Sequence, residues 1–268
     1  FVFITGVSKF SKLNLFSGLN NLEDITIDNE YAEICGYTHS DLKTVFKEYL
    51  IGVDMEMVRR WYNGYNYFGE KVYNPYDILL FIAKGHEFRN YWWNTGNPAF
   101  LIDMLREKNY YIPRLEGAEI SEEELDVFDV GRINVLSLFW QTGYLTFKKK
   151  IIDEFGGIRY TLGVPNLEIQ RSLNSLLVDY LTGEDNEKFR FRSELSRCLR
   201  SGDFESFIRV LRSIFASIPY QNYARNIIAQ YEGYYSSVVY VYLSAIGYEV
   251  IPEDNTNRGR IDLTLKLP

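Results

Sequence analysis

The stretch that decides the fold of the C-terminal end is RIDLTLKL, residues 260–267. Apolar and polar residues alternate strictly along it, which predicts a strand with one apolar and one polar face. Residues 248–253 predict its partner strand, and the polar run 254–259 predicts the turn between them. Aspartate is disfavoured in strands, so Asp262 on the polar face is the first candidate for a functional residue.

A helix is predicted immediately upstream of these strands. Apolar residues recur at helical spacing from Ala224 to Ile246, and Gly247 is a suitable C-terminal stop. Glu232 lies at the margin of the apolar face. A helix packed on the following strands would bring Glu232 toward Asp262, and two convergent carboxylates can hold a hard divalent cation. The alternative is a solvated strand face and an unrelated helix-edge glutamate.

Length and composition exclude several classes of protein. A chain of 268 residues with 46% hydrophobic and 24% charged residues predicts one large or two ordinary globular domains. The net charge of −7 excludes a wholly basic protein that coats nucleic acid. Two cysteines and two histidines exclude a disulfide framework and a four-ligand zinc site, so His39 and His86 are interpreted as structural or surface residues. We expect a cytoplasmic protein without a membrane contact.

The first half of the chain predicts a short strand followed by helices. Residues 1–5 form a continuous apolar strand, and residues 6–28 are loop-like. Helices are predicted over 41–50 after the N-cap Thr38, from Asp54 to a turn at 63–66, and from Pro75 to near Gly85. The aromatic run 61–65 either packs a helix end against its neighbours or stacks bases or a partner peptide.

The middle of the chain has the order helix, hairpin, helix over residues 132–181. Residues 144–147 and 158–162 predict the two strands of the hairpin. This order is winged-helix-like and serves either DNA contact or domain packing. Residues 183–186 form the clearest linker, and residues 188–212 are helical with seven basic and three acidic residues. That segment either follows phosphates or is a solvated face with ion pairs.

The C-terminal motifs resemble a known superfamily. Residues 230–235, 247–250 and 257–263 are similar to the core of PD-(D/E)xK nuclease-superfamily domains, in the branch found at the C-terminus of bacterial AAA-ATPase-like proteins. The resemblance implies that Glu232 and Asp262 bind the metal and are catalytic. A Glu-x-Lys on the next strand would follow beyond Pro268, and Lys266 does not match its lysine. The site is therefore expected to be incomplete within this sequence.

The N-terminal part resembles the AAA-ATPase-like module of the same proteins. The matching stretches are 3–10, 16–22, 61–65, 73–76 and 91–96. The resemblance implies a late sheet strand at residues 1–5, from which Thr5 and Lys9 would reach the γ-phosphate of ATP; a plain strand-to-loop turn is the alternative. The sequence contains no phosphate loop of the form GxxxxGK[ST], so ATP binding is expected only in a longer protein.

Together these patterns predict an α/β protein, mostly helical, with a truncated P-loop ATPase remnant, a winged-helix-like middle and a partial nuclease-like end. Residues 1–183 form the ATPase-like region (strand remnant 1–35, lid 36–183), 184–222 a basic helical linker region, and 223–268 the nuclease-like domain. The expected function is an AAA-ATPase-like protein fused to a nuclease that uses Mg²⁺ or Mn²⁺ on DNA or RNA. The alternative is a non-catalytic module whose aromatic clusters bind a partner protein.

Overall fold

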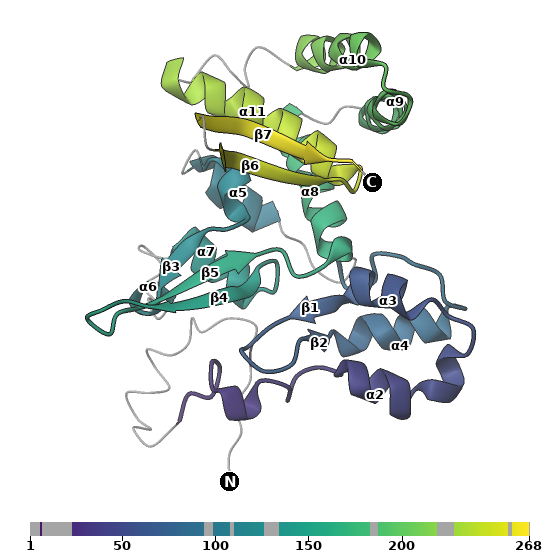
Figure 1. Ribbon diagram of the computed structural model, residues 1–268, viewed down its shortest axis with the longest axis vertical. Helices are drawn as coiled ribbons and strands as arrows, with labels where there is room; N and C mark the ends of the chain where they lie inside the picture. The colour runs from purple at the N-terminus through teal and green to yellow at the C-terminus, as the bar shows by residue number, and fades with distance from the viewer. Residues whose placement is uncertain are drawn as a thin grey trace. The chain divides into compact units, whose positions relative to one another are not determined.

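The computed structural model describes residues 6, 23–93, 99–107, 110–125, 134–182, 187–218, 228–256 and 259–267. The chain divides into two compact units. Unit 1 comprises Phe1–Leu105 and Leu115–Ile169, and unit 2 comprises Arg106–Arg114 and Gln170–Pro268. The fold is mixed α/β with many helices and small antiparallel sheets (Figure 1). The predicted strand at residues 1–5, with Thr5 and Lys9, lies outside the described residues.

The N-terminal helices of unit 1 begin close to where the sequence predicts, and Thr38 is the N-cap that was expected. Thr38 and Asp41 form a reciprocal capping box, in which the Asp41 carboxylate accepts from the Thr38 backbone N–H at 2.7 Å. Asp54 and Asn74 cap the next two helices through their side-chain oxygens. The helix predicted over 41–50 is instead a short α-helix followed by a 3₁₀ turn. The elements are η1 (Asn29–Tyr31), α2 (His39–Thr44), η2 (Lys47–Leu50), α3 (Met55–Tyr62), α4 (Pro75–Ala83) and α5 (Ala99–Glu107).

The aromatic run 61–65 packs inward. Tyr62 is fully buried and Trp61 is nearly so, and both rings lie against Phe88. The Tyr62 hydroxyl donates to the carbonyl of Arg89 at 3.0 Å. These side chains build the core of unit 1 together with α2 and α4, so they present no free ring faces to a base or a partner peptide.

The turn predicted at 63–66 is a short strand, β1 (Asn63–Tyr65), paired with β2 (Val72–Tyr73). Gly64 in β1 has φ 134°, and its Cα approaches the backbone of Pro165. A Cβ at this position would lie 2.0 Å from the Pro165 carbonyl oxygen. Only glycine fits both the backbone conformation and the close approach.

We therefore expect Gly64→Ala to destabilise unit 1 by about 3 kcal/mol or more, because strain and a backbone clash act together. Gly52→Ala is the matched control: Gly52 has φ 77° but nothing lies within 4 Å of its added Cβ. In this control the free energy of unfolding should fall by only about 1 kcal/mol, because the strained φ is its single cost. Urea unfolding followed by tryptophan fluorescence measures both. Equal losses of unfolding free energy in the two variants would show that the contact with the Pro165 backbone adds nothing to the cost.

The predicted hairpin of the middle region is confirmed. β4 (Thr146–Ile152) pairs antiparallel with β5 (Ile158–Gly163), with Phe147 opposite Leu162. A third strand, β3 (Glu119–Ser121), pairs with the other edge of β5. The Phe147 and Tyr160 rings pack 4.7 Å apart between their centroids. The neighbouring elements are η4 (Ile112–Leu115), α6 (Glu122–Leu125), α7 (Val135–Gln141) and α8 (Leu167–Thr182).

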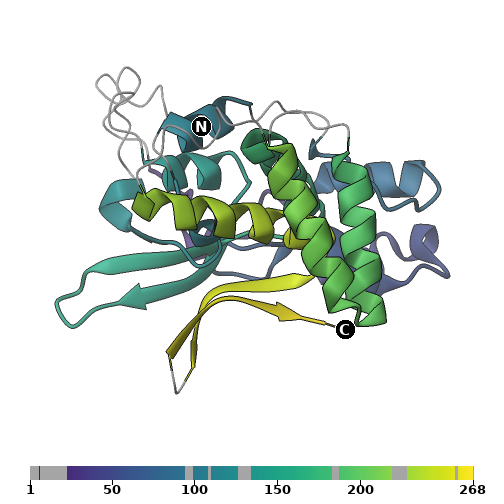
Figure 2. The ribbon, with the colours of Figure 1, turned by 90° about the horizontal axis from the view of Figure 1, so that it is seen from above.

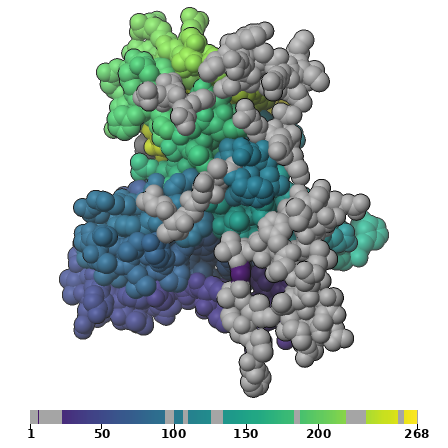
Figure 3. All heavy atoms as spheres, turned by 180° about the vertical axis from the view of Figure 1, so that it is seen from behind, coloured from purple at the N-terminus to yellow at the C-terminus, as the bar shows by residue number. Residues whose placement is uncertain are grey.

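Unit 2 contains most of α8 and the helices that follow it. The helix predicted from Lys188 to Leu211 is wrong as a single element. It is broken at Gly202, which has a left-handed φ of 69°, and Asp203 caps a new helix by accepting from Ser206 N–H. The two resulting helices, α9 (Lys188–Ser201) and α10 (Phe204–Ser217), pack side by side (Figure 2). Figure 3 draws the atoms of this part of the chain in green.

The C-terminal elements follow the predicted order. α11 (Ile228–Ala245) ends before Gly247, whose φ is 97°. β6 (Glu249–Thr256) and β7 (Gly259–Lys266) then form an antiparallel pair (Figure 1). α11 contacts α9 and both strands. Within the described ranges, no helix combines the length and apolarity needed to cross a membrane.

Candidate functional site

Asp262 lies in the middle of β7 with an exposed side chain. The neighbouring register pairs, Pro252 with Leu263 and Asp254 with Ile261, place Glu253 opposite Asp262. Glu253 has a left-handed φ of 49°, an uncommon conformation for a non-glycine residue. Within the described residues, the Asp262 carboxylate has no hydrogen-bond or ion-pair partner. Its oxygens are therefore available to a ligand.

The backbone of Glu232 lies in the second turn of α11, and its side chain is outside the described part of the structure, so the predicted approach to Asp262 stays a prediction. The Tyr111 ring lies over Gly233 of α11, 3.5 Å from where a Cβ of that glycine would be. The Tyr111 hydroxyl also hydrogen-bonds the Ser236 side chain. Tyr111 therefore packs on α11 through Gly233 and Ser236.

The same tyrosine connects α11 with the strand pair. Burial raises the pKa of Tyr111, and the negative charges of Glu253 and Asp262 raise it further. The hydroxyl of Tyr111 is therefore within electrostatic reach of both carboxylates. Tyr111 was not identified from the sequence, because it lies more than 100 residues before α11 and β7 and belongs to no motif.

Two arginines face Glu253. Arg260 Nη1 lies 3.4 Å from Glu253 Oε1, and Arg114 Nη2 lies 3.7 Å from the same oxygen. The Arg114 guanidinium also lies over the Tyr111 ring, 5.7 Å from its centroid. The Arg114 and Arg260 side chains are 65% and 58% exposed, so solvent ions can reach both. Neither arginine was identified from the sequence.

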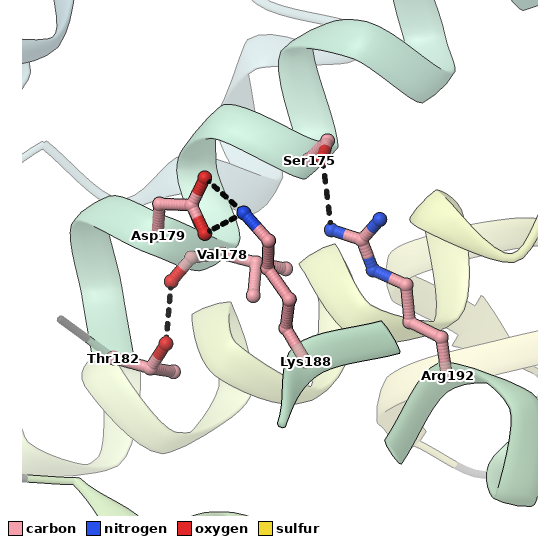
Figure 4. A network of polar contacts seen from close by, with 6 residues as sticks. All are labelled: Ser175, Val178, Asp179, Thr182, Lys188 and Arg192. Atoms are coloured by element: carbon pink, nitrogen blue, oxygen red, sulfur yellow. Dashed lines mark hydrogen bonds and ion pairs between the residues drawn. The ribbon is translucent and has the colours of Figure 1, made fainter. Parts of the chain in front are cut away.

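The basic segment 188–212 is partly committed to packing within unit 2. Lys188 forms an ion pair with Asp179 on α8, and Arg192 donates to Ser175 at 3.0 Å (Figure 4). Burial lowers the pKa of Arg192. These two cations join α9 to α8, which removes them from any continuous phosphate-binding stripe along α9.

A buried carboxyl pair lies in unit 1, where the sequence analysis predicted none. Asp77 in the first turn of α4 and Glu168 in the first turn of α8 are both fully buried. Asp77 Oδ1 accepts from the Trp92 N–H at 2.9 Å, and Glu168 Oε1 accepts from the Trp93 N–H at 3.2 Å. The remaining oxygens, Oδ2 and Oε2, find no other donor among the described residues, and the two carboxyl groups hydrogen-bond each other.

A hydrogen bond between two carboxyl groups requires one of them to be protonated. Burial raises the pKa of Glu168 to about 9, and the charge of Asp77 adds to the shift. Burial also raises the pKa of Asp77, to about 6. At neutral pH the pair therefore shares one proton and carries one negative charge, which the two backbone N–H groups stabilise.

Each histidine forms a hydrogen bond within unit 1, which is compatible with the interpretation of both as structural or surface residues. His39 Nδ1 lies 2.8 Å from the Tyr73 hydroxyl, and His86 Nε2 lies 2.8 Å from the Tyr49 carbonyl oxygen. Over the described part of the chain, no three of its histidine, cysteine and acidic side chains gather into a metal-binding group.

The C-terminal end is a long helix followed by an antiparallel strand pair that carries an exposed aspartate. Residues 230–268 match the family model described as the PD-(D/E)XK nuclease superfamily. The match begins two residues before Glu232 and includes β6 and β7. It does not extend into the region predicted to be ATPase-like, for which no match supports the prediction.

One curated relative matches along nearly the whole chain. It is 46% identical over 267 residues, which are 99% of this chain and 51% of the relative. It is described as an uncharacterized protein in the vnfD 5′ region of Azotobacter chroococcum mcd 1. The chain therefore spans about half the length of the relative it matches. No solved structure matches the chain.

Proposed function

We propose that the C-terminal end of this protein belongs to a metal-dependent nuclease that cleaves phosphodiester bonds in nucleic acid. The match of residues 230–268 to the nuclease superfamily carries the proposal. The exposed, uncommitted carboxylate of Asp262 on a strand beside α11 supports it. Asp262 and Glu232 are the proposed metal ligands and catalytic residues.

The donor chemistry at Asp262 fits Mg²⁺ or Mn²⁺. Hard divalent cations take carboxylate oxygens, and Asp262 offers two that no other described group occupies. Glu232 would add a ligand from α11, directly or through a water molecule. When bound, such an ion supplies Lewis-acid activation of water and offsets charge on the leaving oxygen. The chain's own part is to hold Asp262 at a fixed register position on β7.

Two further parts of the prediction rest on the resemblance of the motifs. A Glu-x-Lys on the strand after β7 would complete the site, and its lysine would orient the attacking water. An ATPase-like region over residues 1–183 stays a prediction that rests on the resemblance of its motifs. The alternative of a partner-binding module loses its basis at residues 61–65, because those aromatic side chains are mostly buried.

The direct test is a cleavage assay on the full-length protein. Labelled single- and double-stranded DNA and RNA are incubated with Mg²⁺ or Mn²⁺, and parallel reactions contain a chelator instead. Cleavage of at least one substrate in the metal-containing reactions alone is expected. Complete inactivity on all of them, in protein whose folding is verified by circular dichroism, would contradict the proposal.

A further inference from the structure

The charges beside Asp262 are arranged as a balanced cluster. Glu253 and Asp262 contribute two negative charges, and Arg114 and Arg260 contribute two positive charges. Both guanidinium groups point at one oxygen, Glu253 Oε1, so a single carboxylate serves two cations. A guanidinium has five N–H donors, and one shared oxygen at 3.4–3.7 Å leaves most of them to solvent or to a ligand.

The arginines come from different parts of unit 2 and are held in place. Arg260 lies on β7 two residues before Asp262, hence on the same face of the strand. Arg114 belongs to the segment Arg106–Arg114, which clusters with unit 2. The Tyr111 ring beneath Arg114 is itself fixed by Gly233 and Ser236 of α11. Arg114 is therefore positioned by packing and a cation–π contact, rather than by its ion pair alone.

We propose that Arg114 and Arg260 form a binding site for a phosphodiester group of nucleic acid, in which Glu253 is the internal anion that the phosphate displaces. This inference rests on the proposed nuclease function for its ligand. Guanidinium groups pair with phosphate oxygens through two parallel N–H donors, so an incoming phosphate makes better contacts than one shared carboxylate oxygen. Divalent cation binding at Asp262 would leave this cluster with a net positive charge and strengthen the attraction.

The test is nucleic-acid binding by the full-length protein in buffer with a chelator, where binding is read without cleavage. Fluorescence anisotropy with a labelled 20-base-pair DNA gives the dissociation constant at several salt concentrations. We expect Arg114→Gln and Arg260→Gln each to weaken binding about tenfold and to lower the salt slope by about one. Glu253→Gln should tighten binding severalfold, because both guanidinium groups are released.

Arg159→Gln is the matched control. Arg159 Nη1 lies 3.4 Å from Glu119 Oε2 in unit 1, and both of its ion-pair side chains are half exposed. The Arg159→Gln substitution removes one positive charge from an ion pair of similar exposure. The affinity of this variant for DNA should stay within twofold of wild type. Titration with inorganic phosphate distinguishes a site for the nucleic-acid backbone from a site for free phosphate. We expect millimolar phosphate to displace no DNA. Tight binding of free phosphate would overturn the assignment to the nucleic-acid backbone.

Two results would overturn the phosphate site. One is unchanged DNA affinity in both arginine variants, and the other is weaker binding by Glu253→Gln in protein with an unaltered melting curve. The nuclease proposal is judged separately, by metal binding and cleavage in Asp262 variants. The two proposals can fail separately. If Arg114→Gln loses DNA affinity while Asp262→Ala cleaves at the wild-type rate, the phosphate site is supported and the catalytic role of Asp262 is wrong.

Discussion

Asp262→Ala in the full-length protein is expected to abolish metal-dependent cleavage, with a loss of about 10³-fold or more. The substitution removes an exposed carboxylate of β7 for which the described residues supply no hydrogen-bond or ion-pair partner. Because the side chain is exposed, the fold should be unaffected and the melting temperature should stay within a few degrees. Cleavage rates and Mn²⁺ binding by electron paramagnetic resonance are both measured, so the result does not depend on activity alone.

Asp254→Ala is the control for this experiment. Asp254 lies on β6 of the same hairpin but is paired with Ile261, so it is on the face opposite Asp262. It should retain both Mn²⁺ binding and cleavage. Glu232→Ala should weaken Mn²⁺ binding less than Asp262→Ala, since a helix carboxylate can act through a water molecule. Equal cleavage by wild type and Asp262→Ala would show that the site is assigned to the wrong residue.

The periodic parts of the fold could be predicted because their signals are local. Strict alternation over residues 260–267 predicted β7, and Thr38, Asp54 and Pro75 predicted three helix starts. The break at Gly202 was missed because the apolar and basic pattern continues across it. A single glycine inside a helical pattern is often tolerated. The signal for a break was Asp203, the residue after Gly202, because aspartate is a preferred N-cap of a new helix.

The polar clusters could not be predicted from local patterns. Asp77 and Glu168 are separated by 91 positions in the chain, and each alone is an ordinary acidic residue in the first turn of a helix. Only the fold shows that both are buried and face each other. Arg114 and Tyr111 likewise join the strand pair from the distant segment Arg106–Arg114. Candidate sites built from one stretch, such as Asp262 with Glu232, are accessible to motif reasoning, whereas their neighbours are not.

Glu168→Gln is expected to remove most of the pH dependence of unit 1 stability between pH 5 and pH 9. In the folded protein Glu168 keeps its proton to about pH 9, whereas the unfolded chain releases it near 4.5. The native state therefore binds more protons than the unfolded state throughout this range. Since stability falls with pH wherever the native state binds more protons, the pair destabilises the fold by roughly 1.4 kcal/mol per pH unit and per proton as pH rises.

The slope should be steeper at the acidic end. Asp77 titrates near pH 6 in the folded protein, against an ordinary value of 3.8, so below about pH 6 both groups contribute. A glutamine at position 168 can donate its amide N–H to the Asp77 carboxylate without any shared proton. Glu168→Gln should therefore equal or exceed wild type in stability at pH 8 and lose this advantage at pH 5.

All four tryptophans of the sequence lie in unit 1, so tryptophan fluorescence during urea unfolding reports that unit alone. Trp92 and Trp93 donate to the carboxyl pair directly. The control is Glu119→Gln, which neutralises a half-exposed carboxylate on β3 and should keep the wild-type pH slope. Asp77→Ala, which leaves Glu168 without its carboxyl partner, should destabilise the unit by about 2–4 kcal/mol at pH 7. Parallel pH profiles for Glu168→Gln and wild type would show that the two buried groups do not share a proton.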